Sequence, residues 1–422
     1  MNYILIGAFW GVVLSGAYYF YFYPRRFDFF SLGFAASVFY FLPGLWGKLQ
    51  YISPTMTEFD LSVSVEPLTY VVFIFVLLGI ILGGIVYEKM PSMKITIVFP
   101  NNDNIYKYCT LLFVVMLFLS TKSFLIDYLL VTDKRIIINN IDIKFVLFQY
   151  SILFLIVSTS ISDKNYLQLG IAIGCVLLIL ALNFRFVLVI AGMSIITAIF
   201  FNKKPMSFAR RYYYYLLSLP FVLIFVMALK TFVVYVKYFG IVTGFMQYIA
   251  DFDVQSFLLP GAEFFVTTNI LNEVISQNFH IDNTYLLYVP IYMLPIPSSV
   301  FNIPSNIFNT LFQPQLFADI EWGMAYNPWA EAIAAGGFTL LLIYIMVYVF
   351  SLGISNWLIK SNNLGVKTIG TLCGTFWAFY FHRNSLLSEF AYIRYIVWIG
   401  LLLLICATVA SFLFKCMVFL KR

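Results

Sequence analysis

The chain has 422 residues, of which 62% are hydrophobic and only 10% are charged, and its 25 Lys and Arg against 19 Asp and Glu give a net charge of +6. Soluble domains average roughly 45–50% apolar and about 25% charged residues, so this composition cannot cover a surface that faces water. It excludes a soluble enzyme, a nucleic-acid-binding protein, a disordered scaffold and a disulfide-rich secreted module, and it predicts an all-α polytopic membrane protein.

Hydrophobic runs recur along the whole chain. A membrane-spanning helix needs about 20 mainly apolar residues. The first run is predicted to be an uncleaved span, because Pro24, Arg25 and Arg26 follow it where a signal peptide has a small-residue cleavage site. About eleven spans are predicted, at roughly 2–23, 28–47, 67–87, 106–124, 145–161, 166–183, 185–201, 213–237, 329–357, 365–382 and 389–414.

These spans divide the chain into N-terminal transmembrane helices over 1–239, a loop with short helices over 240–328, and C-terminal transmembrane helices over 329–422. Basic loops stay in the cytoplasm, which sets the sidedness. With the N-terminus outside and the C-terminus inside, the following basic residues all fall on the cytoplasmic side: Arg25, Arg26, Lys89, Lys94, Lys107, Lys203, Lys204, Arg210, Arg211, Lys360, Lys367, Lys415, Lys421 and Arg422.

The long segment over 240–328 contains no Lys or Arg and carries seven acidic residues, so we expect it on the extracytoplasmic side. Its Pro and Gly positions predict short helices broken by turns. Because it is rich in Phe, Tyr and Ile, it is expected to pack back onto the membrane face as a lid.

Two basic sites lie at the predicted outer ends of spans. The motif Asn-Phe-Arg-Phe over 183–186 interrupts an apolar stretch over 166–201 that is twice the length of one span, so it predicts a tight outside hairpin with Arg185 at its tip. The next span carries Lys230 and Lys237, of which Lys237 is expected to anchor the interface and Lys230 to face a cavity. The alternative for Arg185 and Lys230 is a side chain that reaches up to lipid phosphates.

The loop re-enters the membrane over 321–337, where Glu331 falls in the first turn of a helix and a pair of glycines, Gly336 and Gly337, follows. Ionisable residues at membrane depth are costly and usually functional. The alternative for Glu331 is a simple interaction with the positive end of the helix dipole.

The sequence His-Arg-Asn-Ser over 382–385 ends one span on the outer side, and Arg394 lies inside the apolar run of the next. An arginine within the hydrocarbon is hard to explain as an interfacial anchor alone. Together, Arg185, Lys230, Arg383 and Arg394 predict a cationic pocket that opens beneath the long loop.

Guanidinium groups donate paired hydrogen bonds to phosphate oxygens and stay charged when partly desolvated, so this pocket suits a lipid-linked phosphate or diphosphate. The sequence places no acidic pair there to hold a metal. Neutralisation of the ligand charge would then fall to the arginines.

Three of these segments, taken in order and sidedness, resemble the bacterial O-antigen polymerase family, the Wzy-type polymerases of oligosaccharide repeat units that are related to the O-antigen ligases. The motif over 183–186 is similar to the family's arginine-containing hairpin. The run over 323–337 is similar to the segment that closes its long loop, and 382–385 looks like its C-terminal arginine motif. The helix number and the single large loop late in the sequence extend the resemblance over the whole chain.

The resemblance implies an inverting glycosyltransferase with a helical fold of the GT-C type in the bacterial inner membrane, with a periplasmic large loop and no metal or cofactor. Its donor would be a glycan on undecaprenyl pyrophosphate, and its acceptor a lipid-linked repeat unit whose non-reducing-end hydroxyl attacks the anomeric carbon. Membrane lipids and, by family analogy, a chain-length regulator are the other partners; no nucleic acid is expected.

The resemblance also implies residue roles. Arg185, Arg383 and Arg394 would bind the pyrophosphate and stabilise its developing charge, and Glu331 or another loop carboxylate would orient or deprotonate the acceptor hydroxyl. The residues expected to bind substrate are Lys230, His382, Trp322, Tyr326 and Trp329.

The alternatives are a lipid-linked oligosaccharide flippase and an O-antigen ligase. A flippase needs charge along its whole path through the bilayer, whereas the intramembrane charges here cluster on the outer side. A ligase shares the chemistry and differs in its acceptor. A membrane O-acetyltransferase would need a catalytic histidine in a polar setting, and neither His280 nor His382 is so placed.

Overall fold

The computed structural model describes residues 2–23, 25–54, 60–90, 103–129, 131, 134–162, 165–182, 184–204, 232, 235–251, 263–294, 307–320 and 322–420. In this part of the chain the regular secondary structure is helical except for one short antiparallel strand pair, β1 (Lys48–Leu49) with β2 (Val63–Ser64). The all-α class expected from the composition is therefore confirmed.

Within the described residues, six helices are long and apolar enough to cross a membrane, and each coincides with a predicted span. The protein is thus an all-α membrane protein. The first of these helices ends in a π-helical turn, η1, and the last occupies most of α19. They are α1 (Asn2–Ala17) with η1 (Tyr18–Phe22), α4 (Pro67–Lys89), α5 (Asp103–Tyr128), α7 (Ile143–Ile161), α17 (Pro328–Leu358) and α19 (Leu386–Leu420).

The other predicted spans have different outcomes. Three of them are shorter apolar helices: α2 (Phe29–Tyr40), α8 (Tyr166–Ala181) and α9 (Phe186–Phe200). The predicted span at 365–382 is α18 (Leu364–Thr375), continued by the π-helix η4 (Phe376–Tyr380) and the 3-10 turn η5 (Phe381–Arg383). Most of the predicted span at 213–237 lies outside the described residues, so the total of eleven stays a prediction.

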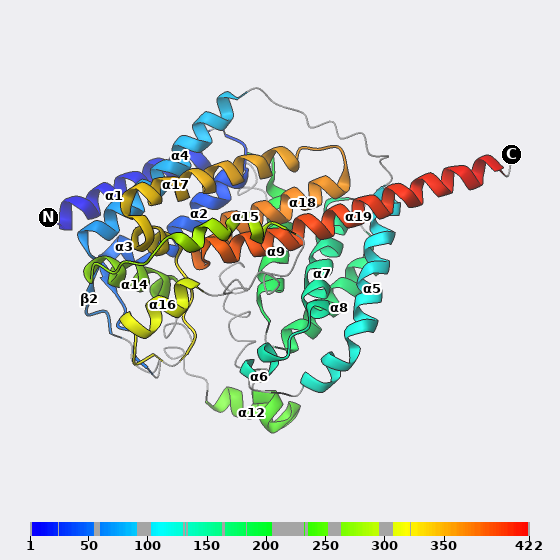
Figure 1. Cartoon of the computed structure of the whole chain (residues 1–422), viewed down its shortest axis with the longest axis horizontal. Helices are drawn as coiled ribbons and strands as arrows, with labels where there is room; N and C mark the ends of the chain where they lie inside the picture. The colour runs from blue at the N-terminus through cyan, green and yellow to red at the C-terminus, as the bar shows by residue number, and fades with distance from the viewer. Residues whose placement is uncertain are drawn as a thin grey trace.

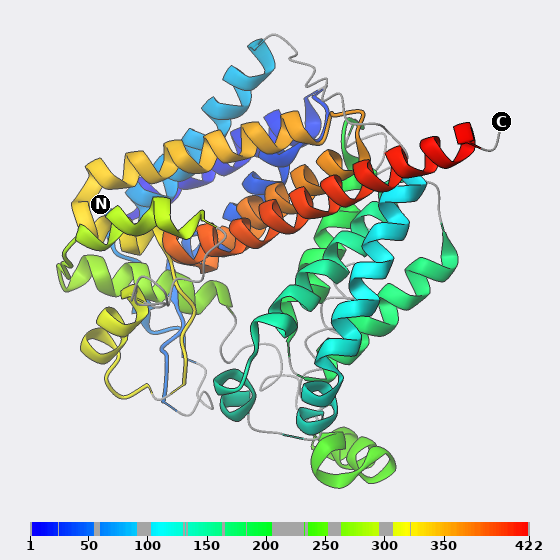
Figure 2. The same ribbon diagram turned by 45° about the vertical axis from the view of Figure 1, so that its right-hand side comes forward.

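The helices form two groups that α18 joins. In Figures 1 and 2, α1, α2, α4 and α17 lie together, and α5, α7, α8 and α9 form a second group inclined steeply to the first. Helix α18 packs against α17 of the first group and against α7 and α9 of the second, while α19 packs along α18, α5 and α7. The core lies between these helices and is dominated by aromatic and branched aliphatic side chains.

Polar residues directly before the apolar runs start several helices. The Asp28 side chain accepts a hydrogen bond from the Ser31 amide and begins α2. The Asn327 side chain accepts from two amides of the first turn of α17, with Pro328 at the first helical position, where its missing N–H costs nothing. These caps fix where each span begins.

Helix α17 is broken near its start. Gly336 and Gly337 have non-helical backbone angles, and Gly337 has φ +60°, a conformation that favours glycine. The Ala334 carbonyl at this break accepts a hydrogen bond from the Ile281 amide, 3.0 Å away. The glycine pair that the sequence singled out therefore kinks the helix and lets the long loop attach to it.

The predicted short helices of the long loop are present in its described part. Helix α14 packs against α2, α4 and α17, and α15 packs against α19. Helix α12 lies apart from them, beyond one end of α5 (Figures 1 and 2). The elements are α12 (Ile241–Ala250), α14 (Glu263–Ser276), η2 (Thr284–Tyr288), α15 (Val289–Tyr292) and α16 (Ile307–Leu316).

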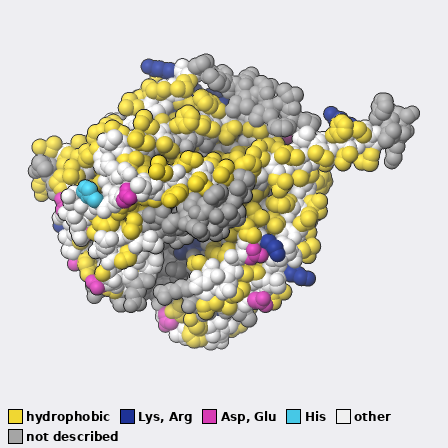
Figure 3. Space-filling view, viewed as in Figure 1, with side chains coloured by type: hydrophobic (Ala, Val, Ile, Leu, Met, Phe, Trp, Pro, Cys, Tyr) yellow, Lys and Arg dark blue, Asp and Glu magenta, His cyan; other side chains and the backbone are white. Residues whose placement is uncertain are grey.

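Apolar side chains cover most of the molecular face seen in Figure 3, and charged side chains lie scattered toward its margins. Many of these apolar side chains are large and exposed, such as Met116 of α5, Phe350 of α17 and Phe412 of α19. Lipid tails, rather than water, suit such a surface.

An ion network centred on the buried Arg25 ties the first group of helices together at the end that the sequence predicts to be cytoplasmic. The Arg25 guanidinium donates to Asp28 from Nη2 and to Glu88 from Nε, both at 2.8 Å. It also lies 4.6 Å from the Phe20 ring centroid. A Cβ on Gly84 would come within 3.2 Å of Arg25 Nη1, so glycine leaves the room that lets this guanidinium lie against α4.

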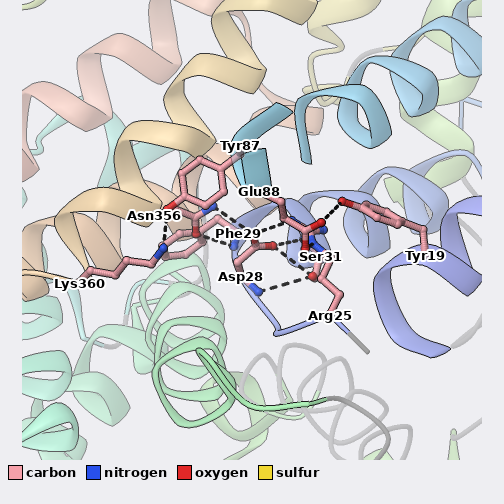
Figure 4. A network of polar contacts seen from close by, with 9 residues as sticks. All are labelled: Tyr19, Arg25, Asp28, Phe29, Ser31, Tyr87, Glu88, Asn356 and Lys360. Atoms are coloured by element: carbon pink, nitrogen blue, oxygen red, sulfur yellow. Dashed lines mark hydrogen bonds and ion pairs between the residues drawn. The ribbon is translucent and has the colours of Figure 1, made fainter. Parts of the chain in front are cut away.

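The same network reaches α17. Asn356 accepts a hydrogen bond from the Phe29 amide and donates to Asp28, and Lys360 donates to the Tyr87 hydroxyl at 2.8 Å. Figure 4 shows how these side chains converge. We call them the inner ion network: Tyr19, Arg25, Asp28, Ser31, Tyr87, Glu88, Asn356 and Lys360.

The loop after α9 meets the same end of the molecule, because the Phe27 amide donates to the Lys203 carbonyl and the Asn202 amide donates to the Phe27 carbonyl. Arg25, Lys203 and Lys360, which the sequence predicts on one side of the membrane, thus lie together. Arg25 itself is only 3% exposed, so it is a buried partner of two carboxylates rather than a solvated loop charge.

Candidate functional site

Arg383 and Glu263 form an ion pair at the opposite end of α17 from the inner ion network. Arg383 ends the turn η5, and Glu263 is the first residue of α14. The guanidinium also lies 5.1 Å from the ring centroid of Tyr380. The two charged side chains remain 29% and 41% exposed, so other molecules can reach this ion pair.

Arg185 joins this pair from the other group of helices. It lies directly before α9 and interacts electrostatically with Glu263, Arg383 and Tyr380. Burial lowers the pKa of Arg185, nearby Glu263 raises it, and Arg383 lowers it further. Two of the three arginines that the sequence predicted in one pocket, Arg185 and Arg383, are therefore brought together. We call this group the outer arginine cluster: Arg185, Glu263, Tyr380 and Arg383.

The cluster carries an excess of positive charge among the described residues, since two guanidinium groups face one carboxylate. Lys230, the other cation predicted there, lies outside the described residues. An unbalanced, partly exposed pair of guanidinium groups can accept an anionic group with several oxygen atoms, such as a diphosphate.

Arg394 lies in α19, the helix that follows the turn carrying Arg383. Its guanidinium is 4.8 Å from the Tyr395 ring centroid, and its Nη2 donates to the Tyr395 hydroxyl at 3.2 Å. Tyr395 in turn stacks on Tyr150 of α7 with the ring centroids 5.2 Å apart. These contacts place Arg394 in the packing of α19 against α7, and its predicted role in binding pyrophosphate stays a prediction.

His382 and Trp329 are buried in the core beside Arg383. The Trp329 indole donates to His382 Nδ1 at 3.2 Å. His382 Nε2 lies 3.0 Å from the Ser37 hydroxyl and 3.2 Å from the Tyr348 hydroxyl. Both hydroxyls donate their protons to backbone carbonyls. Because an indole N–H only donates, Nδ1 is the acceptor and the neutral ring carries its proton on Nε2.

This arrangement gives His382 and Trp329 a positioning role. Their side chains are 1% and 0% exposed and make their polar contacts with protein groups, so in this structure they hold the turn that presents Arg383. Neither faces an open surface where a sugar could stack.

Glu331 holds the same turn from its other end. Its carboxylate is fully buried and accepts hydrogen bonds from the Tyr285 hydroxyl at 2.9 Å and from the Leu386 amide at 2.8 Å. Leu386 is the first residue of α19, so Glu331 caps that helix across space and ties it to α17 and η2.

A second buried carboxylate, Glu389, accepts a hydrogen bond from the Asn384 side chain at 2.9 Å. Asn384 follows Arg383, so the turn between α18 and α19 is fixed by contacts on both sides. This dense local network orders the backbone and leaves the Arg383 side chain aimed at Glu263.

Tyr326 and Trp322 lie on the loop side of the same turn and stay partly exposed. The Tyr326 amide donates to the Arg383 carbonyl at 3.1 Å. Burial raises the pKa of Tyr326 to about 12, so its phenol keeps its proton. The Trp322 indole N–H is buried without a partner among the described residues. Both rings remain candidates for contact with a sugar.

Sequence reasoning did not single out Glu263. It counted this residue as one of seven acids in the long loop, because nothing in the adjacent sequence marks it. Its partner Arg383 is 120 positions away, and the pairing exists only once α14 packs against η5. A search of the long loop for acidic residues that could neutralise the arginines predicted on the outer side would have pointed to Glu263.

Comparison of the chain with family models, with curated proteins and with solved structures finds no match. The resemblance to O-antigen polymerases therefore rests on the three sequence motifs. Two of those motifs supply Arg185 and Arg383, which the fold brings to the same cluster.

Proposed function

We propose that this protein is a glycosyltransferase that polymerises lipid-linked oligosaccharide repeat units at the extracytoplasmic face of the bacterial inner membrane. The observation that carries the proposal is the outer arginine cluster: Arg185 and Arg383, from helices far apart in the sequence, meet around one partly exposed carboxylate. The finer features implied by the resemblance, about eleven spans, a GT-C-type fold and a periplasmic loop, belong to the same proposal.

The donor is a glycan on undecaprenyl diphosphate, and the arginines bind the diphosphate. A guanidinium presents a planar fork of donors that matches two phosphate oxygens, and it stays charged at any physiological pH. When the glycosidic bond to the diphosphate breaks, negative charge grows on the leaving oxygen. Fixed cations aimed at that oxygen stabilise the transition state more than the ground state, which is what accelerates the reaction.

Glu263 has two successive roles in this scheme. Without substrate it neutralises Arg383. The incoming diphosphate competes for the same guanidinium and displaces the carboxylate, which is then free to accept the proton of the acceptor hydroxyl. The hydroxyl oxygen forms the new bond to the anomeric carbon, the bond from that carbon to the diphosphate oxygen breaks, and the electron pair leaves with undecaprenyl diphosphate.

The buried groups behind the cluster keep Arg383 in place. Trp329 through His382, and Glu331 through Leu386, fix the two ends of the turn that carries it. A guanidinium displaced by about 1 Å loses much of its effect on the reaction, so these contacts matter to activity without touching substrate.

Purified protein in lipid nanodiscs, given isolated undecaprenyl-diphosphate-linked repeat units, tests the proposal. We expect a ladder of longer lipid-linked glycans from the native chain and none from Arg383→Ala. Arg26→Ala, an exposed arginine at the other end of the molecule, is the matched control and should make the same ladder. A ladder of equal yield from Arg383→Ala would overturn the assignment of the site.

A cellular experiment separates the polymerase from the flippase and the ligase. Deletion of a polymerase gene should leave lipid A-core capped by a single repeat unit, whereas loss of a flippase or a ligase should leave the core uncapped. Uncapped core in the deletion strain would contradict polymerisation.

A further inference from the structure

Helix α12 has an apolar face that the rest of the described chain covers only at Phe245, whose ring meets the Phe232 ring edge to face with the centroids 6.1 Å apart. Ile241, Val242, Phe245, Met246 and Ile249 lie on one side of this helix, and each is at least 50% exposed. Their spacing of three to four residues places them along one stripe. The polar residues Thr243 and Gln247 fall on the other side of the helix.

The opposite side of α12 packs against the short helical stretch that precedes it in the sequence. A Cβ on Gly244 would come within 2.7 Å of the Tyr235 carbonyl oxygen, so glycine permits this close approach. The Tyr235 hydroxyl donates to Asp251 at 3.1 Å, and the Tyr235 ring meets the Tyr248 ring edge to face. The two stretches thus form one packed hairpin that presents the apolar stripe outward.

This hairpin is fixed at the level where the membrane-spanning helix α5 ends. Lys237 Nζ donates to the Val131 carbonyl at 2.9 Å, and Val131 follows the last turn of α5. Figures 1 and 2 both show α12 beyond that end of α5. Helix α5 also carries large exposed apolar side chains, among them Met116 in its middle and Ile126 near this end.

Two observations indicate whether lipid or another protein surface covers the stripe. It lies beside the end of α5, a helix long and apolar enough to cross a membrane, whose exposed apolar side chains suit lipid. A ten-residue helix is about 15 Å long and about 10 Å across, so its footprint falls well short of the roughly 800 Å² per partner that stable protein interfaces bury. A second copy of the chain is therefore a poor match, and lipid is a good one.

We infer that α12 is an interfacial helix that lies in the plane of the membrane and inserts its stripe among the acyl chains of the outer leaflet. An amphipathic helix of this kind buries its apolar face about 5–10 Å into the boundary between head groups and chains. Because α12 carries no Lys or Arg, the attraction of this helix to the membrane comes from its apolar stripe and not from charge. This membrane contact goes beyond the proposed transferase reaction and does not depend on it.

Nitroxide labels on neighbouring residues of α12 test the inference in the full-length protein. Single cysteines replace Met246, on the stripe, or Gln247, on the polar side, in a chain whose five native cysteines are changed to serine or alanine. The labelled proteins are reconstituted in phospholipid bilayers, and collision with oxygen, which concentrates in lipid, is compared with collision with a water-soluble nickel chelate. Labels at Met116 and at exposed Asp282 provide the lipid and water references.

The ratio of oxygen to nickel accessibility should be several-fold higher at position 246 than at position 247 and close to that at position 116. Equal, high nickel accessibility at both positions would place the stripe in water and overturn the inference. Low accessibility of position 246 to both reagents would show a protein partner on the stripe and overturn it as well. Native-like gel-filtration profiles of each labelled chain exclude unfolding as the cause of either result.

Discussion

In the described part of the chain, arginine meets carboxylate in two clusters, which lie at opposite ends of the 31-residue helix α17. In the inner ion network, Arg25 is 3% exposed and lies between Asp28 and Glu88. In the outer arginine cluster, Arg383 and Glu263 stay partly exposed, and Arg185 adds a second positive charge.

The difference lies in burial and charge balance, because the paired groups are the same. A buried arginine whose charge is matched by carboxylates holds helices in place, and its burial keeps a ligand from reaching it. A partly exposed cluster with surplus positive charge is held less tightly by its own partners and attracts an anion. The comparison therefore indicates a structural role for the inner network and supports the proposed binding role of the outer cluster.

The largest expected effect is loss of the fold when the inner network is broken. Arg25→Ala leaves Asp28 buried without its cation, which costs about 3–5 kcal/mol. We expect little folded protein, measured as the monodisperse yield in mild detergent. The neighbouring exposed Arg26→Ala should give native yield; equal yields from the two variants would contradict the structural role.

Arg383→Ala, in contrast to Arg25→Ala, should leave the protein folded and lower its activity. We expect a normal folded yield, because the side chain is partly exposed, and a loss of about 10²–10³-fold in turnover, because a donor aimed at the developing charge is gone. The rate of chain elongation in nanodiscs measures this. A variant that fails to fold would mean that the outer pair is as structural as the inner one.

Arg185→Lys keeps the positive charge and removes the planar fork. Loss of hydrogen bonds to a charged group costs about 1.5–3 kcal/mol, which corresponds to roughly a ten- to hundredfold drop in kcat/KM. Full activity of the lysine variant would show that charge alone is needed at this position, and would remove the argument for two-pronged binding.

The smallest expected effect is a difference in stability between two tryptophan variants. Trp329→Phe removes the hydrogen bond to His382 and should cost about 0.5–1.5 kcal/mol of stability, together with part of the activity, because the turn before Arg383 loosens. Trp322→Phe removes an indole N–H that has no partner among the described residues and should leave the unfolding temperature unchanged. Equal shifts in the two variants would contradict the positioning role of Trp329.

The sequence predicted the helical membrane class and the grouping of Arg185 with Arg383, because composition and basic-residue sidedness follow from membrane physics directly. It placed Arg25 among the cytoplasmic loop charges and Arg383 in the outer pocket, but it could not show that Arg25 is buried between two carboxylates. Both follow aromatic residues at the end of a span, and their different roles depend on the distant residues Glu88 and Glu263 that pack beside them.

Polar residues near the predicted site were harder to interpret for the same reason. Glu331, His382 and Trp329 sit in motifs that drew attention as catalytic or substrate-binding groups, yet the fold buries all three against protein donors and acceptors. Sequence shows that such residues lie near a site; only packing shows whether they face a ligand or hold the residue that does.

Binding of undecaprenyl diphosphate to the purified protein, compared with undecaprenyl monophosphate by native mass spectrometry, tests the central claim most directly. The account predicts that the native chain prefers the diphosphate and that Arg185→Ala and Arg383→Ala each lose that preference while remaining folded. Undiminished preference for the diphosphate in both variants would contradict it.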